Sequence, residues 1–126
     1  MKHVIKTDQA PTASSPFSQG WRAGDFVYTC GCGGEDPVTG ELVEGGIEAQ
    51  TRQTLLNIQA ILRAAGAELS DVVKVTAHLT DLANAPAYNR VYTEFFPGDK
   101  PARTTVGSQL LGGFLVEIDV VAYTGK

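Results

Sequence analysis

The sequence lacks a basic cluster and any long apolar run. Ten lysine and arginine residues are scattered among fourteen acidic residues, giving a net charge of −4 and a pI near 5.0. This balance argues against a nucleic-acid partner, because phosphate binding needs a basic surface. Residues 1–10 are polar, and no apolar run approaches membrane-spanning length. We therefore expect no signal peptide, no membrane partner and a cytoplasmic location.

Cysteine is nearly absent and occurs only at positions 30 and 32. Two thiols one residue apart on a strand point the same way but are poorly spaced for a mutual disulfide. With only His3 and His78 as histidines, they also make a poor metal-ligand set. We expect reduced, metal-free thiols that line a pocket or the core.

The composition is otherwise that of an ordinary globular protein. Hydrophobic residues make up 43% of the 126 positions and charged residues 19%. This length predicts one domain over residues 1–126, small for an enzyme that encloses its own active site. The low charged fraction also suggests that another subunit covers part of the surface.

Hydrophobic periodicity predicts an α+β fold. Strands are predicted at 20–23, 26–31, 71–79, from Arg103 onward and at 114–123, helices at 47–65 and from Asn84 to before Pro97, and a loop at 11–19. This order favours a mixed β-sheet with both helices on one face. The other face would carry Val72, Leu115 and Val121, so we expect a homo-oligomer that covers it.

Arg103 and Glu117 are the most informative charged residues. Pro101 holds its neighbour extended, and on the following strand Arg103 and Thr105 share one face. The planar arginine fork suits a carboxylate or phosphate, and the alternative is a surface arginine paired with an acidic residue. Glu117 lies in an apolar strand, where an unpaired buried carboxylate is costly. It either pairs with Arg103 or is poised for chemistry.

Several short motifs, in order from about Pro11 to Ala122, together resemble the reactive intermediate deaminase (Rid, or YjgF) family. They are Pro16-Phe17-Ser18-Gln19, Asp36-Pro37-Val38-Thr39-Gly40-Glu41-Leu42-Val43, Gln50-Thr51-Arg52 with Asn57 and Ala65-Gly66, Asn89-Arg90-Val91-Tyr92 to Phe96, Pro101-Ala102-Arg103, and Val116-Glu117-Ile118.

This resemblance implies a chorismate-mutase-like fold and a homotrimer with a central barrel and clefts between subunits. It also implies hydrolysis of enamines or imines of 2-keto acids to the keto acid and ammonia, without a metal or organic cofactor. Arg103 corresponds to the arginine that grips the substrate carboxylate, Glu117 to the acidic residue associated with water, and Asn89 to the helix asparagine.

This chain departs from the family pattern in its pocket. Phe17 replaces a tyrosine, Cys30 a serine, Cys32 a glutamine and Thr105 a cysteine. We expect Phe17, Cys30, Thr105 and the backbone around Gly31 to contact substrate together with Arg103 and Asn89. Cys30 has no recognisable activating histidine, which disfavours a covalent nucleophile.

Two alternatives to a general imine deaminase remain open. The altered pocket fits a paralogue dedicated to one pathway, such as an aminomuconate- or aminoacrylate-processing deaminase. A non-catalytic trimer that binds small carboxylates or acts like a chaperone is the other. Ribonuclease or translation-inhibitor activity has also been attached to the family, but the acidic charge and the missing basic stripe disfavour it.

Overall fold

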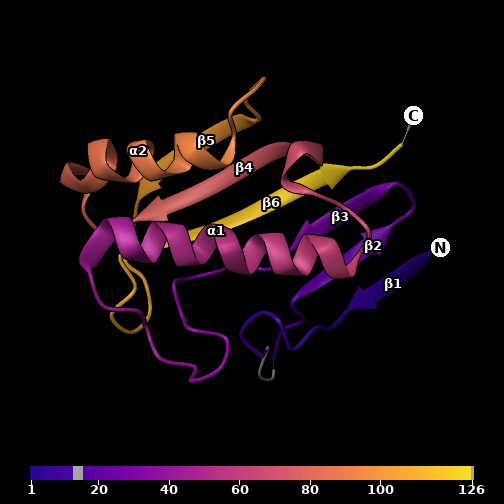
Figure 1. Cartoon of the computed structure of the whole chain (residues 1–126), viewed down its shortest axis with the longest axis horizontal. Coiled ribbons are helices and arrows are strands. Elements are labelled where there is room, and N and C mark those ends of the chain that lie inside the picture. The colour runs from indigo at the N-terminus through magenta and orange to yellow at the C-terminus, as the bar shows by residue number, and fades with distance from the viewer. Residues whose placement is uncertain (13–15, 126) are drawn as a thin grey trace.

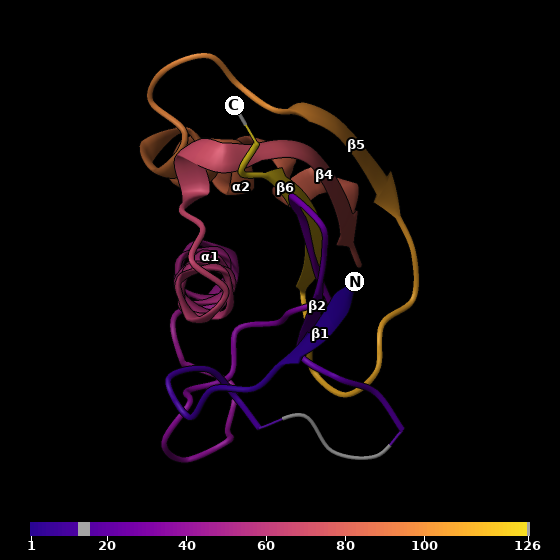
Figure 2. The same ribbon diagram turned by 90° about the vertical axis from the view of Figure 1, so that its right-hand side faces the viewer.

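The computed structural model describes residues 1–12 and 16–125 and contains one six-stranded sheet with two helices. The strand order is β1-β2-β3-β6-β4-β5, and only β4 and β5 run parallel. Both helices cover the same face of this mixed sheet, as Figures 1 and 2 show. The predicted arrangement of two helices on one face is therefore confirmed. The elements are β1 (Lys2–Ile5), β2 (Gly20–Ala23), β3 (Phe26–Thr29), α1 (Gly46–Ala64), β4 (Val72–Leu79), α2 (Ala85–Phe95), β5 (Ala102–Gly107) and β6 (Val116–Tyr123).

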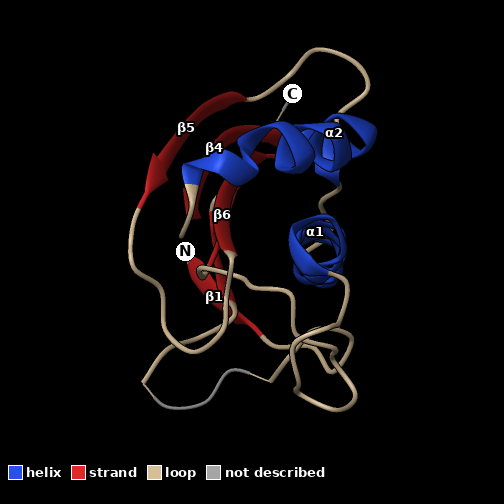
Figure 3. Ribbon diagram, turned by 90° about the vertical axis from the view of Figure 1, so that its left-hand side faces the viewer, coloured by secondary structure: helices blue, strands red, loops and turns tan. Residues whose placement is uncertain are grey.

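Helix α1 packs along the middle of the sheet (Figure 3). Leu55, Ile58 and Leu62 are fully buried on one side of the helix, as the 3.6-residue period predicts. The helix ends where Gly66 adopts φ 81°, and the amide of Gly66 donates to the carbonyl of Arg63. This helix supplies the main apolar contact for the centre of the sheet.

The first strand was not predicted. β1 pairs with β2 in antiparallel register at the edge of the sheet, and three of its four residues are exposed. An edge strand with little burial carries no apolar alternation, so the sequence pattern is silent there. Strand β3 ends at Thr29, two residues earlier than predicted. The predicted 11–19 loop includes residues 13–15, which lie outside the described residues.

The prediction for the face of Val72 is wrong. A β-bulge between Val72 and Lys74 shifts the register of β4 against β6. Val72 is consequently buried in the core, whereas Val73 is 47% exposed. A bulge adds one residue to a strand and reverses the alternation before it. The remainder of β4 follows the predicted faces, with Val75 fully buried.

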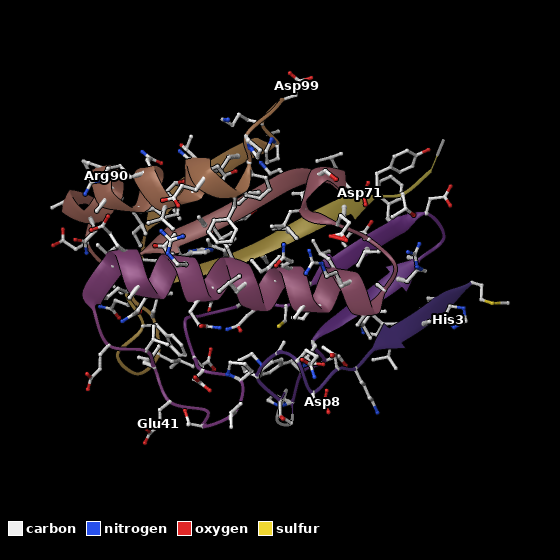
Figure 4. The ribbon with its side chains drawn as sticks, in the orientation of Figure 1. His3, Asp8, Glu41, Asp71, Arg90 and Asp99 are labelled. Carbon is white, nitrogen blue, oxygen red and sulfur yellow. The ribbon has the colours of Figure 1, made fainter. Side chains whose placement is uncertain are left out.

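The helix-free face still carries exposed apolar residues. Trp21, Phe26, Tyr28 and Tyr123 are each 38–44% exposed, and the Phe26 and Tyr123 rings lie 5.0 Å apart. The acidic side chains of Glu41 and Asp99, by contrast, extend outward from loops at opposite edges of the fold (Figure 4). Within the described ranges, neither helix is long and apolar enough to cross a membrane.

Candidate active site

Arg103 lies at the centre of a cluster of polar and aromatic side chains from β5 and α2. Its Nη1 donates a hydrogen bond to Asn89 Oδ1 at 2.9 Å. Its guanidinium carbon lies 4.6 Å from the ring centroid of Tyr92 and 5.2 Å from that of Tyr88. Thr105 Oγ1 lies 3.5 Å from the Tyr88 hydroxyl. The structure thus brings together Arg103, Asn89 and Thr105, all three predicted from the sequence.

The two tyrosines of this cluster were not predicted to have a role. Tyr88 and Tyr92 are buried, and each presents a ring face to the guanidinium at cation–π distance. Burial, followed by the neighbouring Tyr88, raises the pKa of Tyr92 to about 12, while Arg103 opposes the shift. Tyr92 therefore stays a neutral ring beneath a permanent cation. Their i, i+4 spacing was visible in the sequence but indicated only a core face.

Arg103 makes no ion pair with an acidic residue in the described part of the chain. The three ion pairs there join Arg52 to Glu94, Arg63 to Glu68 and Arg90 to Glu48. Among the described residues, Arg103 is therefore not a surface arginine paired with a carboxylate. Its side chain is exposed, and its remaining N–H groups can receive an anion.

Glu117 lies in a second place, the thiol pocket. This pocket of about 420 Å³ is lined by Phe17, Cys30, Gly31, Gly33, Glu35, Leu111, Phe114 and Glu117. Gly31 lies directly against the carboxylate, since a Cβ on this glycine would be 2.7 Å from Glu117 Oε2. The structure thus brings together Glu117, Phe17, Cys30 and Gly31, the other four predicted residues. A larger groove of about 820 Å³ borders β1 but contains neither Arg103 nor Glu117.

Buried amides hold the loops that form this pocket. Asn57 Nδ2 donates to the carbonyls of Gly33 and Glu35 at 3.0 and 2.9 Å. Gln50 Oε1 accepts a hydrogen bond from the Leu115 amide at 2.9 Å. Both amides project from α1, and both are at least 94% buried. The sequence motifs contained these residues, but their positioning role depends on loops that fold back onto the helix.

The two thiols lie close together, with Cys30 lining the pocket and Cys32 buried beside it. Cys30 Sγ and Cys32 Sγ are 3.9 Å apart, and both cysteines are free thiols. The hydrogen bond with Cys32 lowers the pKa of Cys30, although burial opposes this shift. The same hydrogen bond and burial raise the pKa of Cys32 well above its usual range. No group of three or more potential metal-ligating residues gathers within the described residues.

Of the two alternatives left open for Glu117, pairing with Arg103 does not occur within one chain. On β4, Val75 is the partner of Arg103 and His78 is the partner of Glu117. Residues three apart on a strand point to opposite faces, so Arg103 points toward the helices and Glu117 away from them. Two strand spacings and three residues of rise place their Cα atoms about 14 Å apart. The chain therefore carries two separate parts of the predicted site.

A family model described as Endoribonuclease L-PSP matches residues 7–124. The chain belongs to this family. The solved structure of YyfA from Yersinia pestis, a protein of the conserved Rid family, superposes with a TM-score of 0.94. It is 42% identical, and the match covers 98% of this chain and 99% of YyfA. The resemblance to the Rid family is therefore confirmed.

Two relatives show how names differ within the L-PSP family. RutC family protein PH0854 of Pyrococcus horikoshii is 48% identical over 124 residues, which cover 98% of both chains. The mouse 2-iminobutanoate/2-iminopropanoate deaminase is 37% identical over 126 residues, covering 99% of this chain and 93% of the mouse protein. Both relatives match nearly the whole chain, and the mouse protein is named as an imine deaminase.

Proposed function

We propose that this protein hydrolyses 2-imino acids, and the enamines that tautomerise to them, to 2-keto acids and ammonia. The observation that carries this proposal is Arg103, an exposed guanidinium that is fixed by Asn89 and two tyrosine rings and forms no ion pair with a carboxylate of residues 1–12 or 16–125. A 2-imino acid supplies that carboxylate next to its reactive C=N carbon. The name of the mouse relative supports the same substrate class.

Arg103 binds the substrate by two parallel hydrogen bonds to its carboxylate. This grip orients the C=N carbon toward the opposite side of the cleft, and such positioning supplies several kcal/mol of a reaction barrier. Asn89 already accepts one N–H of the guanidinium and limits its rotation. Little freedom remains to be lost when the anion binds.

Glu117 handles the protons. Its carboxylate accepts a proton from water as the water oxygen bonds to the C=N carbon, and it passes this proton to the imine nitrogen, which gives a neutral tetrahedral carbinolamine. Glu117 then accepts the hydroxyl proton as the C=O bond forms and delivers it to the nitrogen as the C–N bond breaks and ammonia leaves. Phe17 and the Gly31 backbone form the walls around this carboxylate. The products are the keto acid and ammonia.

The active site is completed between subunits of a homotrimer. Arg103 of one subunit and Glu117 of its neighbour face the same cleft in this proposal. Two observations support assembly: the two residues lie on opposite faces of their own sheet, and the helix-free face exposes Trp21, Phe26 and Tyr28. Light scattering at micromolar concentration should report a trimer. A monomer would contradict both the assembly and the shared cleft.

The decisive experiment measures imine lifetime. 2-Iminobutanoate or 2-aminoacrylate is generated in situ, and hydrolysis competes with a nucleophilic amine trap. The wild-type protein should divert the imine to keto acid and ammonia. Arg103→Ala should lose about 3–4 kcal/mol of transition-state stabilisation, roughly 10²–10³-fold in kcat/KM, and Arg103→Lys should recover little because it lacks the planar fork.

The matched control is Arg63→Ala. Arg63 is also an exposed arginine, and it pairs with Glu68 at the far end of α1. Its removal should leave imine hydrolysis unchanged and alter stability little. Wild-type hydrolysis by a folded Arg103→Ala protein would refute the proposed function. We do not extend the nuclease of the family description to this chain, because its net charge is −4 and its basic residues are scattered.

A further inference from the structure

Cys30-Gly31-Cys32 forms a close dithiol that the proposed hydrolysis does not use. The two sulfur atoms are 3.9 Å apart, and the Cys32 thiol also lies 3.5 Å from the carbonyl oxygen of Cys30, to which it can donate. Cys30 is half-buried in the wall of the thiol pocket, whereas Cys32 is only 7% exposed. Small solutes that enter the pocket can therefore contact Cys30, whereas Cys32 is shielded from them.

The surroundings give the two thiols different reactivity. The hydrogen bond with Cys32 favours the thiolate of Cys30 and lowers its pKa. The same hydrogen bond, together with burial, raises the pKa of Cys32 and so favours its protonated form. Thiolates are the reactive form of cysteine. Backbone bonds in both directions between Cys32 and Ile118, at 2.8 and 2.9 Å, also hold Cys32 in place.

We propose that Cys30 and Cys32 form a peroxide-reactive dithiol in which Cys30 is the attacking thiol and Cys32 the resolving one. The Cys30 thiolate attacks one oxygen of hydrogen peroxide, breaks the O–O bond and becomes a sulfenic acid, with hydroxide as the leaving group. The Cys32 sulfur then attacks the Cys30 sulfur and loses its proton. The S–O bond breaks, water leaves, and an intrachain disulfide remains.

The spacing of the two cysteines is unfavourable for a disulfide, but closure is within reach. Two residues of extended chain separate Cα atoms by roughly 6.6 Å, near the upper end of the usual disulfide range. Gly31 between them has no side chain to resist rotation. The Cys30 amide is held by a hydrogen bond to the Gln19 carbonyl at 2.8 Å, but its half-buried side chain can rotate toward Cys32. A disulfide at this limit is easily reduced. Oxidation draws the Cys30 sulfur out of the thiol pocket, and reduction restores it.

Peptide mass spectrometry tests the proposal without any imine assay. The folded protein is treated with hydrogen peroxide, alkylated and cleaved with trypsin. The tryptic peptide of residues 23–52 contains both cysteines, and the single methionine, Met1, lies outside it. We expect most of this peptide to lose two hydrogens, and dithiothreitol to reverse the loss. Dimedone present during oxidation should trap a fraction as a sulfenic acid adduct on Cys30.

Two variants separate the roles of the thiols. Cys32→Ala should form the Cys30 sulfenic acid, which dimedone traps in full, and should never lose two hydrogens. Cys30→Ser should leave the buried Cys32 unmodified under the same treatment. Circular dichroism checks the fold of both, and the wild-type trapping experiment stands if Cys32→Ala does not fold.

Three results would overturn the dithiol proposal. One is a wild-type peptide that gains oxygen atoms on Cys30 without losing two hydrogens. Another is a disulfide between two chains on a non-reducing gel. The third is a Cys30 thiol that stays intact while free glutathione in the same tube is oxidised. None of these results depends on the imine deaminase assignment.

Discussion

Mixing two inactive variants tests whether the site is divided between chains. Arg103→Ala removes the carboxylate anchor, and Glu117→Gln removes the proton acceptor. Within one chain the two residues point to opposite faces of the sheet, and strand geometry separates their Cα atoms by about 14 Å. No rotation of either side chain joins them in a single chain. In the proposed trimer, however, a cleft between neighbours takes Arg103 from one chain and Glu117 from the next.

This arrangement gives a definite magnitude. In trimers assembled at random from equal amounts of the two variants, half of the chains keep Arg103 and the other half keep Glu117. About one quarter of the clefts then hold both residues, so the mixture should recover roughly 25% of wild-type imine hydrolysis. Each variant alone should retain about 1% or less.

The assay unfolds and refolds the two variants together, with each variant refolded alone as the control. Native mass spectrometry of isotope-labelled chains verifies that mixed trimers form. The imine is generated in situ, and keto-acid release is measured against the amine trap. A verified mixture that is no more active than the average of its parents would refute the shared cleft.

Other substitutions separate chemistry from structure. Glu117→Gln should bind a 2-keto acid nearly as well as wild type in calorimetry yet hydrolyse imine at least about a hundredfold more slowly, because the amide accepts no proton. Asn57→Ala should lower the free energy of unfolding in urea by about 2–3 kcal/mol, since the buried carbonyl of Gly33 and the partly buried carbonyl of Glu35 lose their donor. Burial raises the pKa of Asp119, so its folded form holds the proton more tightly, and the resulting stability is lost as pH rises through that pKa. Asp119→Asn should therefore raise Tm at pH 7 and change it little below about pH 4.

Periodicity predicted the elements with regular burial. Helix α1, predicted at 47–65, spans Gly46–Ala64, and β4, predicted from residue 71, begins at Val72. Both have many apolar residues at one spacing, because each packs one side against the core. Strand β1 has no such spacing, and the bulge near Val73 depends on pairing with β6. Neither had a local signal in the sequence.

The two parts of the candidate site were predictable to different degrees. Local pattern placed Arg103 and Thr105 on one strand face and Asn89 on the preceding helix, and the structure brings all three together. To predict that Arg103 and Glu117 point to opposite faces, one needs the registers of β5 and of β6 against β4. Strand β4 is distant from both in the sequence. Alternation within each strand gives two faces but not which face the helices cover at β5. Sequence reasoning therefore named the residues and could not assign them to opposite sides.

The opposite placement also explains why each half of the site is stable in its own chain. Arg103 needs no carboxylate because the faces of Tyr88 and Tyr92 attract the cation and Asn89 accepts one N–H. Folding has thus already restricted a long, flexible side chain whose ordering would otherwise oppose binding. Glu117 remains half-exposed at the thiol pocket, where its carboxylate does not bear the cost of full burial. If the two formed an ion pair within the chain, a substrate carboxylate would have to displace Glu117 from the guanidinium. In the proposed mechanism, their separation leaves Arg103 free to bind a substrate anion and Glu117 free to accept a proton.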